Sequence, residues 1–84
     1  MVRVHMPAKV LAVFEPGKCP VPYKVKVRDN RNNEILMYID VIRNIDTRSF
    51  NSILYDCVSI SGDREKQFQL IYYIGKYQWY LFGI

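Results

Sequence analysis

The chain has 84 residues and a mass of 10.0 kDa, a length that one hydrophobic core usually fills, so we expect a single domain. Half of the residues are hydrophobic and 14% are aromatic, which excludes the apolar-poor composition of disordered chains. The net charge of +4 and the pI near 9.2 favour acidic partners only mildly.

The first predicted strand covers residues 9–15, a short apolar and β-branched run. It is closed by a turn in which Pro16 stands second and Gly17 third, the arrangement of a type II turn. The residues before this strand include Met6, a second potential start, within a His-Met pair of the kind that cloning leaves behind. We therefore expect residues 1–8 to be a disordered or foreign tail and residues 9–84 to form the domain.

The second predicted strand follows Pro20 and Pro22, which cannot donate to a ladder and so place its start at a sheet edge or a bulge. Beyond them, one face of the strand is apolar, and its residues are Tyr23, Val25 and Val27. The opposite face is a row of three cations, Lys24, Lys26 and Arg28. Residues 29–33 are typical of a hairpin loop.

The third predicted strand runs from Glu34 toward Ile42 and is apolar on both faces, as in a covered central strand or one that curls around a barrel. Residues 43–52 indicate a loop that Ile45 and Phe50 anchor in the core, or a single helical turn. The fourth strand covers residues 53–60, with a bulge near Asp56.

The last two predicted strands meet at Gly75–Lys76, the glycine-first pattern of a two-residue type II′ turn. Pairing Ile74 with Tyr77 sets the register of this hairpin. One face is then expected in the core, with Leu70 opposite Leu81 and Tyr72 opposite Trp79. The other face carries Ile71, Tyr73, Tyr80 and Phe82, bordered by Gln69 and Gln78, with Ile84 beyond.

These segments predict an all-β fold, a six-stranded antiparallel meander that is curled into a small barrel or folded into a two-layer sandwich. The two cysteines are far apart and form no CxxC motif, so we expect reduced thiols at Cys19 and Cys57, the latter buried.

The sequence lacks the parts of the common catalytic and metal sites. One histidine and two distant cysteines do not make a zinc site, and four scattered glycines do not make a phosphate loop. Asp40 and Asp56 could act as general acid and base, but aspartates near strand ends more often bind backbone amides or pair with arginine. We therefore expect no enzyme activity, no cofactor and no metal.

No apolar run approaches the roughly 18 residues of a membrane span, and the run from Val10 to Phe14 is too short for a signal peptide. We therefore expect a cytoplasmic protein with no membrane partner.

Two surfaces are candidates for a function. The leading hypothesis is association through Ile71, Tyr73, Tyr80 and Phe82, as a homodimer or with an unidentified protein partner, because this face is too apolar for a solvent face. Internal packing against another segment would also explain it. The alternative is weak, largely sequence-independent nucleic-acid binding, in which Tyr73 or Tyr80 stacks on bases. The phosphates would then lie on the cations Lys18, Lys24, Lys26, Arg28 and Arg31. Outward lysines that protect an edge strand from aggregation are the competing explanation of this row.

Four segments in order, at residues 9–15, 20–27, 39–42 and 78–81, read KVLAVFE, PVPYKVKV, IDVI and QWYL. In this order the chain resembles a group of small uncharacterised all-β proteins from low-GC Gram-positive bacteria. The resemblance covers most of the chain from Lys9 onward. It implies a stand-alone bacterial domain and no activity that could be carried over.

Overall fold

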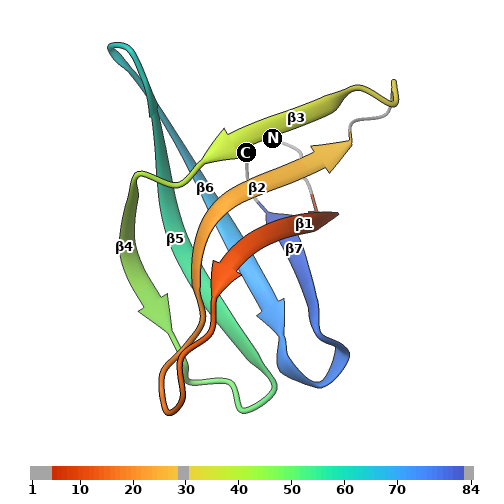
Figure 1. Ribbon diagram of the computed structural model, residues 1–84, viewed down its shortest axis with the longest axis vertical. Coiled ribbons are helices and arrows are strands. Elements are labelled where there is room, and N and C mark those ends of the chain that lie inside the picture. The colour runs from red at the N-terminus through yellow and green to blue at the C-terminus, as the bar shows by residue number, and fades with distance from the viewer. Residues whose placement is uncertain (1–4, 29–30, 83–84) are drawn as a thin grey trace.

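A computed structural model describes residues 5–28 and 31–82, and every regular element in these residues is a β-strand except one 3-10 turn. The strands form one antiparallel sheet that curls into a half-barrel (Figure 1). The elements are β1 (His5–Val13), β2 (Val21–Arg28), β3 (Glu34–Tyr38), β4 (Val41–Asp46), β5 (Ser52–Ser61), β6 (Arg64–Tyr73), η1 (Ile74–Lys76) and β7 (Gln78–Phe82). The predicted all-β fold is confirmed.

The strand order in the sheet is β3-β2-β1-β7-β6-β5-β4, so neighbours in the sheet are neighbours in the chain, apart from the pair of β1 and β7. The two edge strands, β3 and β4, are consecutive and are joined by Ile39 and Asp40. The Ile39 amide donates to the Tyr23 carbonyl on β2, and the Asp40 amide donates to the Val58 carbonyl on β5. The predicted third strand is therefore one bent segment that is split in two, which is why seven strands replace the predicted six.

The predicted loop at residues 43–52 is shorter in the structure, because residues 43–46 belong to β4. The expected anchors of this loop, Ile45 and Phe50, are both exposed. Ile45 lies opposite the buried Tyr55, but β4 is an edge strand whose one neighbour in the sheet is β5, so the Ile45 side chain stays partly open to solvent. Phe50 lies in the loop between β4 and β5. The prediction that these two side chains are buried is therefore wrong.

Part of the predicted N-terminal tail is strand. Residues 5–8 pair with β7, placing Pro7 opposite Tyr80 and Ala8 opposite Trp79, and from Lys9 onward the strand pairs with β2 instead. These residues give β7 a second neighbour, so its backbone groups on that side are paired. The domain boundary moves from residue 9 to residue 5, and residues 1–4 lie outside the described residues, as does Ile84.

The core lies inside the curl, between β2 and β3 on one side and β5, β6 and β7 on the other. Val25, Tyr55, Leu70 and Leu81 are all completely buried. The Tyr55 hydroxyl donates a hydrogen bond to the carbonyl of Pro20, which ties β5 to the segment that leads into β2.

The terminal hairpin has the predicted register, with Tyr72 opposite Trp79 in the core. The turn type differs from the prediction, because Gly75 lies in the 3-10 turn and the left-handed residue is Tyr77, with φ 53°. Residues 74–77 form a loop two residues longer than predicted. The longer loop takes one residue from each strand, Ile74 and Tyr77. The remaining residues therefore keep their predicted partners, and each side chain stays on its predicted face.

Three local predictions on β1, β2 and β5 concern turns and bulges. The type II turn is confirmed by the φ of 76° at Gly17. A bulge at the start of β2 is confirmed, since Leu11 lies opposite Lys24 and Ala12 opposite Pro22. This bulge leaves Tyr23 as the extra residue and turns its side chain outward, so the prediction that it joins the apolar face is wrong.

A bulge also lies next to Asp56, as predicted, but the extra residue is on β4. Ile42 pairs with Cys57 and Asn44 pairs with Asp56, so Arg43 is the unpaired residue. Both cysteines are free, and the expected burial of Cys57 is confirmed. Burial raises the pKa of its thiol to about 12.

Candidate functional site

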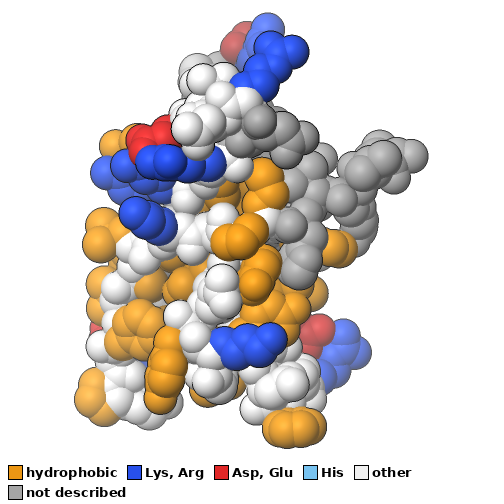
Figure 2. Space-filling view, turned by 90° about the vertical axis from the view of Figure 1, so that its right-hand side faces the viewer, with side chains coloured by type: hydrophobic (Ala, Val, Ile, Leu, Met, Phe, Trp, Pro, Cys, Tyr) orange, Lys and Arg blue, Asp and Glu red, His pale blue; other side chains and the backbone are white. Residues whose placement is uncertain are grey.

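Four neighbouring strands, β5, β6, β7 and β1, share an outward surface crossed by a row of apolar residues. Leu54 lies opposite Ile71, Ile71 opposite Tyr80, and Tyr80 opposite Pro7. We define the apolar face as the surface formed by Pro7, Leu54, Ile71, Tyr73, Tyr80 and Phe82. Figure 2 looks at the side of the molecule where β7 lies. Hydrophobic side chains gather in the middle of this view, with a Lys or Arg side chain below them.

The four residues predicted for partner binding, Ile71, Tyr73, Tyr80 and Phe82, therefore do share one outward face, and each is half-buried. The rings of Tyr73 and Tyr80 meet edge to face, with their centroids 5.5 Å apart. This geometry packs the aromatic side chains against one another and fixes the shape of the face.

Two members of the apolar face were missed by sequence reasoning. Pro7 lies in the segment that was predicted to be a tail, and only its pairing with Tyr80 reveals its position. Leu54 lies on β5, and the signal that could have found it is its alternation with the buried residues Ile53 and Tyr55.

The rows on either side of the apolar row carry polar residues that are almost all uncharged. One row contains Ser52, Tyr73 and Gln78, and the other contains Asp56, Gln69 and Phe82. On β5, β6 and β7, Asp56 is the one charged residue in these two rows, and its carboxylate accepts a hydrogen bond of 2.7 Å from the Gln69 amide. Aromatic enrichment together with depletion of charge distinguishes the centre of protein interfaces from the remaining surface.

The outward surface of β1, β2 and β3 is charged instead. Lys24, Lys26 and Arg28 point outward from β2, as predicted, and Lys9 of β1 lies directly opposite Lys26. We define these four residues as the basic face. Two ammonium groups at directly opposed positions of neighbouring strands repel each other.

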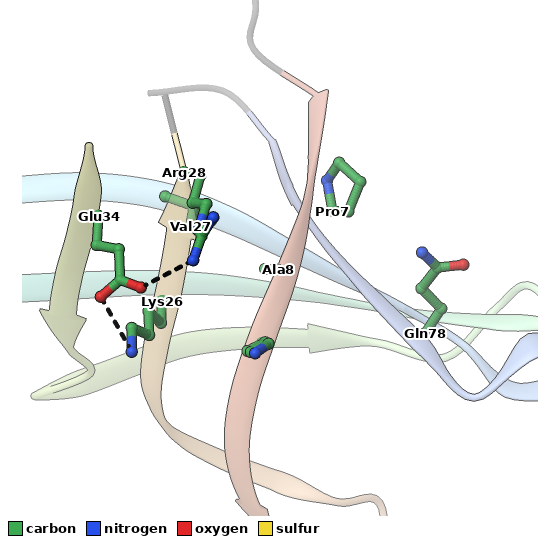
Figure 3. A pocket seen from close by; sticks show the side chains of 8 residues that line it. Pro7, Ala8, Lys26, Val27, Arg28, Glu34 and Gln78 are labelled. Atoms are coloured by element: carbon green, nitrogen blue, oxygen red, sulfur yellow. Dashed lines mark hydrogen bonds and ion pairs between the residues drawn. The ribbon is translucent and has the colours of Figure 1, made fainter. Parts of the chain in front are cut away.

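Among the described residues, one carboxylate lies within the basic face. Glu34 of β3 is 3.1 Å from the Lys26 ammonium and 3.4 Å from the Arg28 guanidinium (Figure 3). The hydrogen bond from Lys26 and the charge of this ammonium lower the pKa of Glu34, so the carboxylate stays ionised. Four cations and one carboxylate leave the basic face with an excess of three positive charges.

The basic face is hollowed at the point where β1 changes its partner. Because β1 leaves β2 at Lys9 to pair with β7, Val27 and Arg28 have no paired strand on that side within residues 5–28 and 31–82. The resulting hollow has a volume of about 460 Å³ and reaches from Glu34 on β3 to Gln78 on β7 (Figure 3). A second hollow of about 500 Å³ lies on the other side of the opposed lysines.

The structure brings together only part of the predicted nucleic-acid surface. Lys18 lies in the turn between β1 and β2, where it pairs with Glu15 at 3.5 Å, while Arg31 lies beyond the opposite end of β2. The aromatic ring beside the cations is the exposed Tyr38 of β3, whose centroid is 5.3 Å from the Lys24 ammonium. The predicted stacking residues, Tyr73 and Tyr80, lie on the apolar face, with β1 in between.

The two aspartates considered for catalysis each have a partner. Asp40 accepts a hydrogen bond of 2.6 Å from the backbone amide of Ile60, and Asp56 is bound by Gln69. In residues 5–28 and 31–82, no group of three or more His, Cys, Asp or Glu side chains is placed to hold a metal ion. No helix within the same residues is long and apolar enough to cross a bilayer.

The chain was compared with family models, curated protein sequences and solved structures. None of these comparisons gives a match, so the resemblance to small Gram-positive proteins stays a prediction.

Proposed function

We propose that the protein is a non-catalytic association module that forms a homodimer through its apolar face. The observation that carries this proposal is the row of apolar residues across four strands, from Leu54 to Pro7, flanked on β5, β6 and β7 by rows in which only Asp56 is charged. The two free thiols fit a reducing compartment, so we place this activity in the cytoplasm.

Two copies of the chain can meet more favourably through the apolar face than through the basic face. Each copy carries a net charge of +4, so two copies repel each other wherever their cations meet. On β5, β6 and β7 these rows contain no lysine or arginine. Two cations border the face at one end, where the Lys76 ammonium is 5.8 Å from the centroid of the Tyr73 ring and Arg48 lines a hollow together with Tyr73. Two copies can therefore approach through this face at a lower electrostatic cost than through the basic face, and a twofold axis would make the contact self-complementary.

The molecule is large enough for such a contact. Standard interfaces bury about 800 Å² on each partner, which is about an eighth of the 6202 Å² of accessible surface of this chain. The aromatic side chains Tyr73, Tyr80 and Phe82 are the expected anchors, because tyrosine and other aromatic residues dominate the energetics of interfaces.

The test is the solution mass by light scattering, at low and at high salt. We expect the wild type to form a dimer of twice 10.0 kDa that survives high salt, since apolar contacts are not screened. The double variant Tyr80→Ser, Phe82→Ser should be a folded monomer. The matched control Leu36→Ser, Tyr38→Ser removes two exposed apolar side chains from β3 and should remain a dimer.

Two outcomes of this experiment would contradict the proposal. A wild-type monomer at every concentration would show that the apolar face does not join two copies. Loss of folding in the Tyr80→Ser, Phe82→Ser variant, read by circular dichroism, would show that these side chains belong to the core.

A second candidate function is weak, sequence-independent binding of single-stranded nucleic acid on the basic face. The observation that favours it is the position of the exposed Tyr38 beside Lys24, on the same surface as Lys26 and Arg28. Binding of single strands combines a cationic groove with aromatic rings on which bases stack.

This second function is tested by the fluorescence anisotropy of a labelled single-stranded oligonucleotide across a salt series. Affinity should fall steeply with salt, because each neutralised phosphate releases counterions. Reversing the charges in Lys24→Glu, Lys26→Glu, Arg28→Glu should abolish binding, whereas Glu34→Gln should strengthen it by removing the one carboxylate. An affinity that does not change with salt would refute phosphate contacts.

A further inference from the structure

Three loops meet at one end of the half-barrel, the lower end in Figure 1. They connect β1 to β2 (14–20), β4 to β5 (47–51) and β6 to β7 (74–77). The Ile74 amide donates a 3.0 Å hydrogen bond to the Asn51 carbonyl, which joins two of the loops. We call this region the loop end.

Each of the three loops presents an exposed aromatic side chain. Phe50 is 95% exposed, Tyr77 is 84% exposed and Phe14 is 59% exposed. The Phe14 ring still contacts Tyr72 edge to face, with centroids 5.9 Å apart, and this contact holds the first loop near the end of β6. Side chains exposed to this degree touch little of their own chain, so Phe50 and Tyr77 stand out from the surface.

Basic side chains lie among these aromatic residues. The loop end carries three cations, Lys18, Arg48 and Lys76, and one carboxylate, Glu15, which is 3.5 Å from the Lys18 ammonium. The side chain of Arg48 is 90% exposed. The carboxylate that pairs with Arg48 belongs to Asp46, whose side chain is only 21% exposed, so the guanidinium lies outermost. Figure 2 shows hydrophobic and basic side chains beside one another at its lower end.

We propose that the loop end docks on the surface of a bilayer that contains anionic lipids. Phe14, Phe50 and Tyr77 would enter the headgroup region, where aromatic side chains are favoured, and the cations would face the lipid phosphates and carboxylates. The expectation of no membrane partner rested on the absence of a spanning run, and docking through loop tips needs no such run.

A bilayer fits this surface better than a folded protein partner. The aromatic side chains protrude from three separate loops, so a protein would have to offer a separate pocket for each of them. A fluid interface accommodates each side chain independently, and anionic lipids attract juxtaposed Lys and Arg. The proposal is independent of the homodimer, because none of Phe14, Phe50 and Tyr77 belongs to the apolar face. The two regions meet only where Lys76 and Arg48 border Tyr73.

The test is flotation of the full chain with vesicles of phosphatidylcholine, with or without phosphatidylserine. The wild type should float with the vesicles that contain phosphatidylserine and less with phosphatidylcholine alone. The double variant Phe50→Ser, Tyr77→Asn should bind at least about tenfold more weakly, because two exposed rings are lost. Asparagine is chosen at position 77 because it tolerates the left-handed backbone.

The matched control is Leu36→Ser, Tyr38→Ser, which removes exposed apolar side chains from β3 and should float like the wild type. A second measurement uses Phe50→Trp, whose added emission should shift to the blue and be quenched by brominated lipids only with anionic vesicles. The proposal is overturned if the wild type does not float, if the loop-end variant floats as well as the wild type, or if the tryptophan emission does not shift. Light scattering of the same variants should show an unchanged dimer, so failure here is distinct from failure of the homodimer.

Discussion

Leu81 and Phe82 are neighbours on β7 that face opposite sides of the sheet, so truncation of each to alanine should have different consequences. Leu81 is completely buried opposite the equally buried Leu70. Phe82 lies on the apolar face and is half-buried. Leu81→Ala should therefore weaken folding, whereas Phe82→Ala should mainly weaken association.

The expected cost of Leu81→Ala is about 2–5 kcal/mol, the transfer free energy of the lost carbons plus that of the cavity they leave. A chain of 84 residues has a free energy of unfolding of roughly 4–13 kcal/mol, so this variant loses a large part of its stability. The Tm should fall by about 4–8 °C for each kcal/mol. Phe82→Ala should cost only about 1 kcal/mol in the monomer, because the ring already contacts water.

The assay is urea unfolding followed by the fluorescence of the buried Trp79, at several protein concentrations. Binding of a second copy stabilises the folded chain, so the wild-type midpoint should rise with concentration. Leu81→Ala should keep this dependence at a lower midpoint, and Phe82→Ala should abolish it. Equal losses of stability in the two variants would refute the assignment of Leu81 to the core and Phe82 to the apolar face.

Three further predictions concern the core and the turns. Burial raises the pKa of the Cys57 thiol from 9.0 to about 12, so the unfolded chain loses this proton at a lower pH than the folded chain. The free energy of unfolding should therefore fall as the pH rises from 9 toward 12. Urea titrations at each pH should show a smaller fall in Cys57→Ala. Tyr55→Phe removes the hydroxyl bound to the buried Pro20 carbonyl and should cost about 1–3 kcal/mol in thermal unfolding, and a neutral result would show that this bond contributes nothing. Gly17→Ala meets no atom within 4 Å but places alanine at a φ of 76°, so calorimetry should show a loss of about 1–2 kcal/mol. Gly75→Ala is the matched control and should leave the free energy of unfolding almost unchanged. A loss of stability equal to that of Gly17→Ala would instead support the type II′ turn predicted from the sequence.

The sequence was most informative where neighbouring strands are joined by short turns. The register of β6 and β7 follows from period-two alternation and the parity of the loop, so the core pair of Tyr72 and Trp79 could be predicted although the turn type could not. The outward position of Ile71, Tyr73, Tyr80 and Phe82 follows from the same parity.

The parts that could not be predicted depend on contacts between distant segments. The strand character of residues 5–8 depends on β7, which lies at the other end of the chain. Tyr38 became a candidate only when the pairing of β2 with β3 placed it beside Lys24. An apolar residue in a loop gives the same sequence signal whether it is buried or exposed, and Phe50 was therefore misplaced.

The central claim is that the apolar face joins two copies of the chain. The most direct measurement is the chemical shift of the aromatic ring protons in NMR spectra recorded over a dilution series. The signals of Tyr73, Tyr80 and Phe82 should move with concentration, while those of Tyr23 and Tyr38 should stay in place. Shifts confined to Tyr23 and Tyr38, or no shift at any concentration, would contradict this claim.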